Sequence, residues 1–266
     1  ISKQLIPVYD KPMIYYPLST LITCGIREIL IISSPHDIGL FKKLLSDGSQ
    51  WGCNITYKIQ KEPRGIAEAF IIAEDFIGSD NVSLILGDNI FYFPSLSSML
   101  LESITANGAS IFAYHVSDPS RYGVVEFTVN NRVLSIEEKP TLPKSNYAIP
   151  GFYFFDNNVV EYAKNLVPSE RNELEITDII NRYHLESALN VIKMDKGTAW
   201  LDTGTVTSLM EASQFVQVLE KRQGLKVGCV EEQAYLMNYI SSTELMQLAN
   251  HFNNGYGQYL LSLLDE

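Results

Sequence analysis

The sequence predicts an α/β protein with a Rossmann-like, mostly parallel mixed sheet and a small helical C-terminal tail. In the first half of the chain, helical patterns alternate with short strands that are almost wholly apolar, such as residues 28–34 and 82–86. Strands of this kind are buried on both faces, which is typical of a parallel sheet covered by helices. From about Val227 onward only short helical patterns follow, and they indicate a separate element.

The order of the elements follows from periodicity and from turn residues. Pro12 and Gly25 bound the first helical pattern, since Pro suits a first helical turn and Gly suits the position past the end. The last long helix, at 205–224, carries its apolar residues on one stripe. Further helices are expected at 38–45, 66–76, 96–106, 159–166 and 175–186, and strands at 28–34, 55–60, 82–86, 109–116, 151–155 and 190–194.

A change of rhythm in the middle of the chain predicts a β-hairpin. Residues 122–127 and 132–138 both have the pattern of strands, and the turn signal Asn130-Asn131 lies between them. Two strands joined by so short a polar turn pair antiparallel. We therefore expect a hairpin next to the apolar strands of the main sheet.

Composition favours a soluble protein. Apolar residues make up 46% of the 266 residues and charged residues 19%. The apolar runs are interrupted before they reach the roughly 18 residues that a membrane helix needs. A chain of this length accommodates one α/β domain with an appendage, and we predict a domain at 1–225 and a helical oligomerisation or regulatory element at 226–266.

The net charge narrows the class of partner. A formal charge of −11 without a Lys/Arg-rich run argues against DNA or RNA. Small phosphorylated substrates remain compatible, because a few convergent cations can set the local field of a cleft. The three cysteines are far apart and indicate free thiols in a reducing cytoplasm, and the four scattered histidines lack the spacing of zinc ligands.

Two aspartates stand where an α/β sheet places its ligands. Asp88 follows the apolar strand 82–86 through Gly87, and Asp202 lies just before the long helix. Ligands of open α/β sheets bind outside the carboxyl ends of the strands. Mg²⁺ is held by one or two carboxylates plus substrate phosphates, so the pair suits a nucleoside triphosphate site. The alternatives are a plain turn at 87–89 and an ordinary helix N-cap at Asp202.

Three basic residues occupy loops rather than helix faces. Lys3, Lys139 and Arg171 lie beside Pro, Ser or Gly. Loops at strand ends are where phosphate contacts belong, although a single Lys or Arg is most often a solvated surface charge. These three residues are therefore candidates for contacts with phosphate.

A set of motifs along the whole chain resembles the bacterial sugar nucleotidylyltransferases, specifically the glucose-1-phosphate thymidylyltransferases. So many motifs in one order are a specific signal, unlike a single glycine pattern. They are SKQLIPVYDKPM at 2–13, GDN at 87–89, RYGVVEF at 121–127, EEKP at 137–140, ELEITD at 173–178, WLDTGT at 200–205, EKRQGLKVGCVEE at 220–232 and NGYGQYL from Asn254.

The resemblance implies roles for the nucleotide and metal residues. By this likeness, Lys3 contacts substrate phosphates, Gln60 hydrogen-bonds the thymine edge, and Gly65 lies against the base. Asp88 and Asp202 would hold Mg²⁺, the implied cofactor.

The resemblance also implies roles for residues that would contact the sugar phosphate. Gly123 and Glu138 would contact glucose hydroxyls, and Lys139 the phosphate of the sugar. Arg171 would contact the phosphate region as well. Two aromatic residues would line the sugar pocket, Tyr153 and Trp200.

The implied reaction joins dTTP and glucose 1-phosphate to give dTDP-glucose and pyrophosphate, in the synthesis of dTDP-rhamnose or other deoxysugars for surface polysaccharides. A phosphate oxygen attacks the α-phosphorus in line, and an anionic nucleophile needs no general base. By the same resemblance we expect a cytoplasmic homotetramer with dTDP-rhamnose as a possible feedback inhibitor. The residues expected to carry catalysis are Lys3, Asp88, Lys139 and Asp202.

The chain also departs from the family pattern. The glycine-rich GGxGTRLxP segment, which cradles the triphosphate, does not occur before the SKQ motif. We therefore expect the sequence to be part of a longer protein, and little or no catalysis from the chain as printed. Arg64 stands where an acidic residue is usual and Pro150 where a threonine is usual, which would alter contacts with the nucleotide and near the sugar.

Two other functions compete with this assignment. A uridylyltransferase or cytidylyltransferase acting on a related sugar 1-phosphate shares most of the chemistry, although the pattern around Gln60 and NGYGQYL favours thymidylyl transfer. A catalytically inactive nucleotide-sugar-binding paralogue or fragment would keep the pockets without the phosphate loop. Comparing the turnover of dTTP, UTP and CTP distinguishes a thymidylyltransferase from the first alternative. The coding sequence upstream of Ile1 distinguishes an active enzyme from the second.

Overall fold

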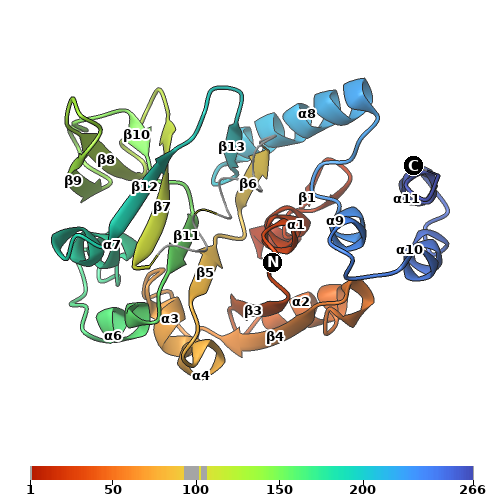
Figure 1. Ribbon diagram of the computed structural model, residues 1–266, viewed down its shortest axis with the longest axis horizontal. Helices are drawn as coiled ribbons and strands as arrows, with labels where there is room; N and C mark the ends of the chain where they lie inside the picture. The colour runs from red at the N-terminus through yellow and green to blue at the C-terminus, as the bar shows by residue number, and fades with distance from the viewer. Residues whose placement is uncertain (1, 93–101, 103–106, 266) are drawn as a thin grey trace. The chain divides into compact units, whose positions relative to one another are not determined.

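The computed structural model describes residues 2–92, 102 and 107–265 and divides into two compact units (Figure 1). Unit one comprises Ile1–Lys58, Gly87–Tyr92 and Leu201–Glu266. Unit two comprises Ile59–Leu86 and Phe93–Trp200. Both units are built from segments that are distant in sequence, so each core depends on long-range packing.

Unit one begins with a short turn and a small hairpin. The 3₁₀ helix η1 (Lys3–Leu5) precedes the strands β1 (Pro7–Val8) and β2 (Lys11–Pro12), which pair antiparallel. Tyr9, with φ of 60°, supplies the tight turn between the two strands. Helix α1 (Tyr15–Thr23) starts only after this hairpin, so the prediction that Pro12 opens the helix is wrong. Pro12 pairs with Pro7 instead, in a strand too short for periodicity to reveal.

The helical tail is part of the core of unit one. Buried residues of α1 pack against Val230, Ala234, Leu245 and Leu260 of the tail in one apolar cluster. The described tail contains helices without strands, as expected, while the predicted boundary near residue 225 stays a prediction. The other elements of this unit are β3 (Glu28–Ser33), α2 (Ile38–Leu45), η2 (Ser49–Trp51), β6 (Asn89–Tyr92), α8 (Val206–Gln223), α9 (Val230–Leu236), α10 (Ser242–Ala249) and α11 (Gly255–Ser262). Two strands are shared with unit two: β4 (Asn54–Ile59) lies in unit one up to Lys58, and β13 (Ala199–Asp202) from Leu201.

The long helix α8 has the ends that the sequence predicts. The Thr205 side chain accepts a hydrogen bond from the backbone N–H of Ser208, and Gly224 closes the helix with φ of 73°. These are the chemical requirements of an N-cap and of a left-handed C-cap. Ala212 and Val216 are fully buried on the inner face, where they pack against the first hairpin and α1.

A buried ionic network joins that hairpin to the end of α8. The Lys11 ammonium is 5% exposed and donates to the carbonyl oxygen of Val227 at 2.9 Å. It also contacts Asp10 at 2.5 Å and Glu220 at 3.4 Å. Glu220 accepts in addition from Lys226 at 2.6 Å, so each buried charge has an opposite charge in contact. Pairing of this kind is what makes a buried charge tolerable.

Unit two contains a mixed sheet. Its strand order is β5 (Val82–Ile85), β11 (Phe152–Phe155), β7 (Ala109–His115), β10 (Tyr147–Ala148), β8 (Gly123–Phe127) and β9 (Val133–Glu138), with β12 (Leu189–Lys193) paired to β7. The β12–β7 pair is parallel, whereas the pairs along the main path are antiparallel. The α/β class with a mixed sheet is confirmed, but the share of parallel pairing in this unit is smaller than predicted. The chain between β11 and β12 is helical, and a parallel pair requires a crossover of this kind.

The predicted central hairpin is confirmed. Strands β8 and β9 pair antiparallel, with Val125 opposite Ile136. Asn131 takes φ of 58° in the turn, a conformation that Asn tolerates better than most residues. The polar turn therefore sets the hairpin, as its sequence indicates.

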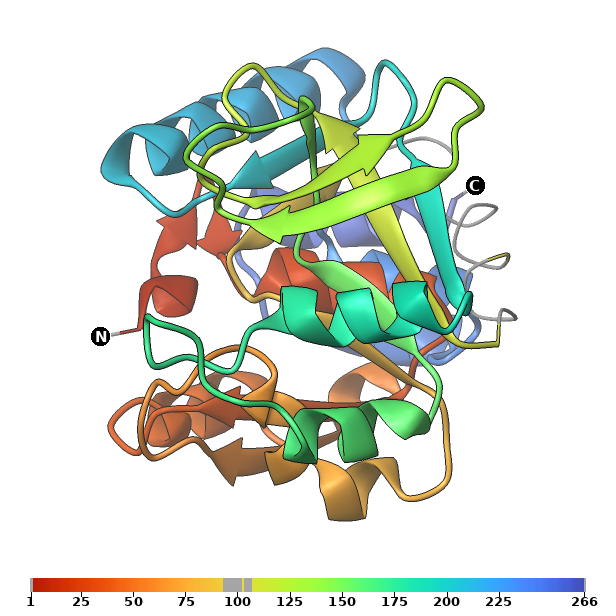
Figure 2. The same ribbon diagram turned by 90° about the vertical axis from the view of Figure 1, so that its left-hand side faces the viewer.

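Helices α6 (Asn158–Lys164) and α7 (Ile176–Leu185) lie against one face of the sheet of unit two, in front of it in Figure 2. The helix expected at 66–76 is divided into α3 (Glu68–Ile72) and α4 (Glu74–Ile77). The helix expected at 96–106 lies outside the described residues, apart from Glu102. Aromatic rings fill the interior, where Phe112 stacks on Phe152 at 5.7 Å between ring centroids.

The cysteines are unpaired, as expected for free thiols. Burial raises the pKa of the Cys53 thiol to about 11, and it raises the pKa values of Cys24 and Cys229 as well. These thiols therefore stay protonated and unreactive at neutral pH.

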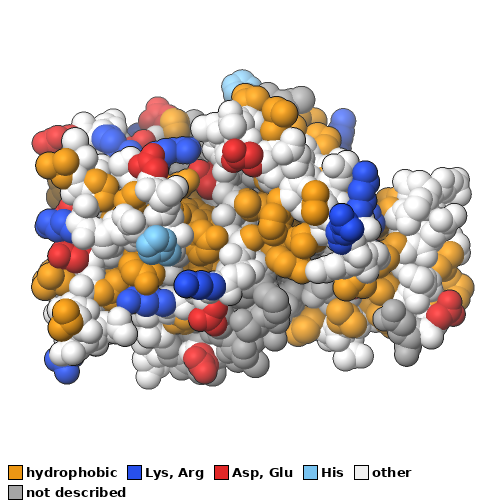
Figure 3. All heavy atoms as spheres, turned by 90° about the horizontal axis from the view of Figure 1, so that it is seen from above, with side chains coloured by type: hydrophobic (Ala, Val, Ile, Leu, Met, Phe, Trp, Pro, Cys, Tyr) orange, Lys and Arg blue, Asp and Glu red, His pale blue; other side chains and the backbone are white. Residues whose placement is uncertain are grey.

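Among the described residues, no helix has the length and apolar character needed to cross a membrane. The face in Figure 3 shows basic and acidic side chains interspersed with apolar ones.

Candidate functional site

Two paired strand ends in unit one bring the predicted aspartates into one neighbourhood. Asp88 directly precedes β6, Asp202 is the last residue of β13, and these two strands pair with each other. Thr203, 3% exposed, donates to the carbonyl oxygen of Asp88 from its backbone N–H at 3.1 Å and from its hydroxyl at 2.7 Å. The chain therefore holds the residue after Asp202 directly against the backbone of Asp88.

Both carboxylate oxygens of Asp88 have a donor. Its Oδ2 forms an ion pair with the ammonium of Lys3, and its Oδ1 accepts from the side-chain amide of Asn89 at 2.9 Å. Lys3 reaches this position because η1 lies beside the 87–88 turn. A Cβ on Gly87 would stand 2.9 Å from Cγ of Gln4, so only glycine allows so close an approach.

The two alternatives for these aspartates resolve differently. The residues at 87–88 do form a turn, as the simpler interpretation expected, and the turn is the feature that directs Asp88. Asp202 is not the N-cap of α8, because Thr205 fills that position. Its carboxylate is therefore not committed to capping the helix.

The chemistry of this donor set fits a magnesium ion. Asp88 and Asp202 supply hard carboxylate oxygens, which Mg²⁺ prefers, and one or two carboxylates suffice when substrate phosphates complete the shell. In the part of the chain that the structure describes, no group of three His, Cys, Asp or Glu gathers into a fuller cage. Two carboxylates are the pattern of a metal shared with a substrate rather than of a closed structural site.

Unit two brings together a second set of predicted residues. Gly123 and Glu138 are direct cross-strand partners in the β8–β9 ladder. Lys139 follows with φ of 41°, and its ammonium lies 3.8 Å from the Glu138 carboxylate. The Arg171 guanidinium lies 3.5 Å from Glu138 and clamps Glu175 with contacts of 2.9 and 2.8 Å. Two cations thus converge on one acidic side chain.

Glu138 has an altered protonation equilibrium. Burial and the neighbouring Glu175 carboxylate raise the pKa of Glu138, while Lys139, Arg171 and a hydrogen bond from Thr177 partly offset that rise. Gly123 leaves room beside it, because a Cβ there would meet Thr177 at 3.0 Å. The arrangement offers an acceptor for hydroxyl groups next to two donors for an anion.

Gln60 and Gly65 form a third set in unit two. Gly65 has φ of 102°, and a Cβ on it would stand 2.4 Å from the carbonyl oxygen of Leu174. The same loop is held by hydrogen bonds from Leu174 N–H to Arg64 O at 2.7 Å and from Ala67 N–H to Leu174 O at 3.2 Å. We call these contacts the 65–174 clasp. They join the loop that carries Gln60 to the loop that carries Arg171.

The two predicted aromatic residues are buried among other rings. Trp200 is 8% exposed and meets Tyr122 and Tyr114 edge-on, with centroids 4.9 and 5.7 Å away. Tyr153, 4% exposed, lies in β11 and stacks on Phe155 at 6.2 Å. Packing fixes both rings and leaves little of either exposed, so their predicted place in a sugar pocket stays a prediction.

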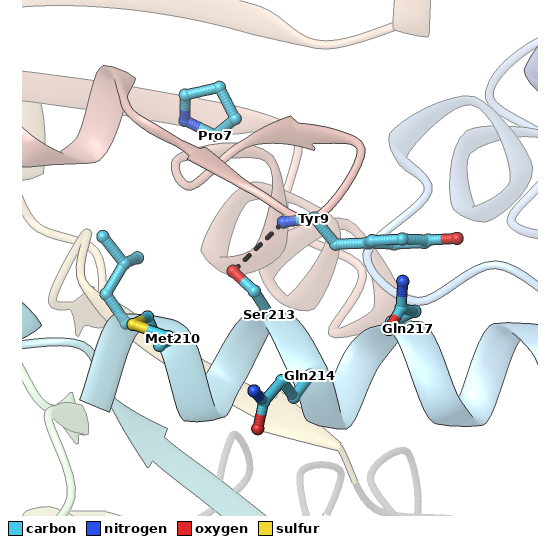
Figure 4. A pocket seen from close by; sticks show the side chains of 7 residues that line it. Pro7, Tyr9, Met210, Ser213, Gln214 and Gln217 are labelled. Carbon is cyan, nitrogen blue, oxygen red and sulfur yellow. Dashed lines mark hydrogen bonds between the residues drawn. The ribbon is translucent and has the colours of Figure 1, made fainter. Parts of the chain in front are cut away.

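A surface pocket of about 360 Å³ lies between the first hairpin and α8 in unit one (Figure 4). The backbone N–H of Tyr9 donates to the hydroxyl of Ser213 across it at 3.3 Å. Its lining includes none of the residues predicted for the site and no charged side chain. The lining residues are Pro7, Tyr9, Leu209, Met210, Ser213, Gln214 and Gln217.

Sequence reasoning did not single out three residues that the structure ties to the predicted ones. Thr203 contacts the backbone of Asp88, Glu68 contacts Gln60 at 2.7 Å, and Glu175 anchors Arg171. The sequence did contain a signal for Thr203, because this residue directly follows Asp202 in the WLDTGT motif. The other two contacts join residues eight and four positions apart and depend on side-chain direction, which spacing does not reveal.

Comparison with known proteins identifies the family of the chain. A family model described as Nucleotidyl transferase matches residues 1–218. The chain belongs to the nucleotidyl transferase family. It is 52% identical to a glucose-1-phosphate thymidylyltransferase of Mycolicibacterium smegmatis, over all of this chain and 92% of the relative. It is 53% identical to one of Neisseria meningitidis, over 99% of this chain and 92% of the relative.

Solved structures support the fold. A crystal structure of a protein described as a glucose-1-phosphate thymidylyltransferase of Bacillus anthracis, in complex with a sucrose, aligns with a TM-score of 0.74 at 39% identity. The alignment covers 80% of this chain and 85% of that one. UDP-glucose pyrophosphorylase in complex with UDP-glucose aligns with a TM-score of 0.71 at 23% identity, over 84% and 92% of the two chains, and bears on the fold alone.

Proposed function

We propose that this chain is a glucose-1-phosphate thymidylyltransferase, which converts dTTP and glucose 1-phosphate into dTDP-glucose and pyrophosphate. The observation that carries the proposal is the pairing of β6 with β13, which sets Asp88 and the residue after Asp202 in hydrogen-bond contact within a chain about half identical to enzymes of that name. Enzymes of this family are generally metal-dependent. Asp88 and Asp202 would hold Mg²⁺, which would neutralise charge on the triphosphate when bound.

The remaining chemistry is positioning and charge neutralisation by the protein. Lys3, already beside Asp88, supplies a cation for the phosphates. In unit two, Lys139 and Arg171 supply cations for glucose 1-phosphate, and Glu138 accepts from hydroxyls of the sugar. The attacking phosphate oxygen is anionic at neutral pH, so the residues align two polyanions rather than remove a proton.

The proposal includes a cytoplasmic homotetramer that supplies dTDP-sugar synthesis for surface polysaccharides, with dTDP-rhamnose as a feedback inhibitor. Support for assembly comes from large apolar side chains on α8 and α9 that face solvent in the single chain. Val206 is 78% exposed, Met210 59% and Leu236 61%. Light scattering on the full-length gene product should give a tetramer, and a stable monomer would contradict this part.

Pyrophosphate release by the full-length gene product tests the assignment. With glucose 1-phosphate and Mg²⁺ present, we expect dTTP to be turned over in preference to UTP and CTP. A strong preference for CTP would make the chain a cytidylyltransferase instead. Binding of dTDP-glucose without turnover of any nucleotide would identify an inactive nucleotide-sugar-binding protein.

The Thr203→Val variant is expected to raise the Mg²⁺ concentration for half-maximal activity about tenfold, with a small change in kcat at saturating Mg²⁺. The variant removes the hydroxyl that holds the Asp88 backbone at 2.7 Å, and residues that orient metal ligands typically affect metal affinity about 10–100-fold. The measurement is a Mg²⁺ titration of initial rates.

Thr203→Ser is the matched control, since it keeps the hydroxyl and should restore the wild-type Mg²⁺ dependence. If Thr203→Val lowers the melting temperature but leaves the Mg²⁺ dependence unchanged, Thr203 supports only the fold.

A further inference from the structure

The side-chain amide of Gln60 is held by two atoms that can only accept hydrogen bonds. Its Nε2 donates to Oε2 of Glu68 at 2.7 Å and to the carbonyl oxygen of Gly65 at 3.3 Å. A carboxylate and a backbone carbonyl have no hydrogen to give. The amide therefore turns its NH₂ group toward both of them. The hydrogen-bond partners alone decide which end of the Gln60 amide is nitrogen and which is oxygen.

Both acceptors are themselves fixed. The 65–174 clasp holds the carbonyl group of Gly65, because the backbone around Gly65 is hydrogen-bonded to Leu174 on both sides. Glu68 is the first residue of α3, two positions before the buried ring of Phe70. The backbone that carries both acceptors is thus held, and with its NH₂ group engaged Gln60 presents its carbonyl oxygen Oε1 to a ligand that approaches from the other side.

An oxygen acceptor at this point discriminates between pyrimidine bases. Thymine and uracil carry a hydrogen on N3 and can donate to Oε1. Cytosine has an unprotonated N3, itself an acceptor, so the same approach would set two acceptors against each other. A side-chain amide that is free to turn would accommodate either base, because it could offer N–H instead.

We propose that Glu68 is a positioning residue for base specificity: it fixes the Gln60 amide so that the site selects bases with an N3–H and rejects cytosine. The proposal rests on the proposed function, in which Gln60 contacts the base, and adds the residue that decides which face of the amide does so. Sites that match a hydrogen-bonding edge reject a mismatched analogue strongly when their polar groups are left unpaired.

The experiment compares kcat/KM for dTTP and dCTP, both with glucose 1-phosphate, in wild-type full-length protein and in Glu68→Gln and Glu68→Leu. Glu68→Gln keeps the shape but offers either an acceptor or an N–H donor, so it no longer fixes the orientation of the Gln60 amide. Glu68→Leu removes the acceptor. We expect the dTTP-to-dCTP ratio to fall about tenfold or more in both variants, equivalent to about 1.4 kcal/mol of discrimination.

Glu161→Gln is the matched control, because Glu161 also accepts from a side-chain amide, that of Asn165 at 2.7 Å, on the exposed surface of α6. Its ratio should equal that of the wild type. A merely structural role of Glu68 would lower both rates together, and an unchanged ratio in Glu68→Gln overturns the inference even if Glu68→Leu does not fold.

Two further outcomes keep this inference separate from the proposed function. A wild-type enzyme that uses dTTP and dCTP equally well overturns the inference but leaves nucleotidyl transfer intact. A full-length protein that releases pyrophosphate with neither nucleotide overturns the proposed function, and this inference falls with it.

Discussion

Replacing Asp88 by Asn is expected to lower kcat about 10³-fold while leaving the fold intact. Asparagine keeps the shape and can still accept from Asn89, but it loses the charge that pairs with Lys3 and that would bind Mg²⁺. Removal of one preorganised electrostatic group in an active site typically costs about 10²–10³ in kcat. Steady-state pyrophosphate release at saturating dTTP and Mg²⁺ measures the effect.

The controls for this prediction use the partner aspartate and a distant one. Asp202→Asn should produce a loss of similar size, and the double variant should lose little more, because residues that act as a unit are not additive. Asp265→Asn, near the end of the chain and exposed, should behave like the wild type. If Asp88→Asn retains more than a tenth of the activity, the metal role assigned to Asp88 is wrong.

Gly65→Ala is expected to destabilise the protein by about 2 kcal/mol or more and to raise the KM for dTTP. The backbone at Gly65 has φ of 102°, which costs an L-residue on the order of 1–3 kcal/mol. The new Cβ would in addition stand 2.4 Å from Leu174 O and 2.6 Å from Leu174 N, so the 65–174 clasp must open. Chemical denaturation gives the free energy of unfolding, and initial rates give the KM.

Gly197→Ala separates the two causes. Gly197 has a similar φ of 95°, but nothing lies within 4 Å of the position that a Cβ on it would take. It should show the backbone cost alone, with the KM for dTTP unchanged. Equal destabilisation by the two variants would mean that the contact with Leu174 contributes nothing, and an unchanged KM in Gly65→Ala would separate the clasp from nucleotide binding.

Much of the fold could be predicted because its signals are local. The hairpin turn at Asn131 and the caps of α8 at Thr205 and Gly224 depend on the conformations that a few neighbouring residues prefer. The prediction for Pro12 was wrong for the same reason. Proline favours both a helix start and an edge position of a short strand, and only its pairing with Pro7 decides between them.

The candidate site also has features that the sequence predicts and features that it does not. The sequence places Asp88 after a buried strand and Asp202 in a loop before a helix, and its motifs indicate the class of reaction. It does not indicate that Glu68 turns the Gln60 amide or that Arg171 is clamped by Glu175. Those contacts depend on which way each side chain points from its backbone.

The sequence by itself determined the family, the order of most elements and the types of residue available for binding phosphate and metal. These are properties of composition and of short segments. Tertiary structure alone decided that β6 pairs with β13 and that the Thr203 hydroxyl donates to the carbonyl oxygen of Asp88, 115 positions away in the sequence. It also decided that the backbone of Leu174 lies against Gly65. Contacts between distant segments form because the folded chain must bury apolar surface and satisfy its backbone groups together, and no local pattern encodes that outcome.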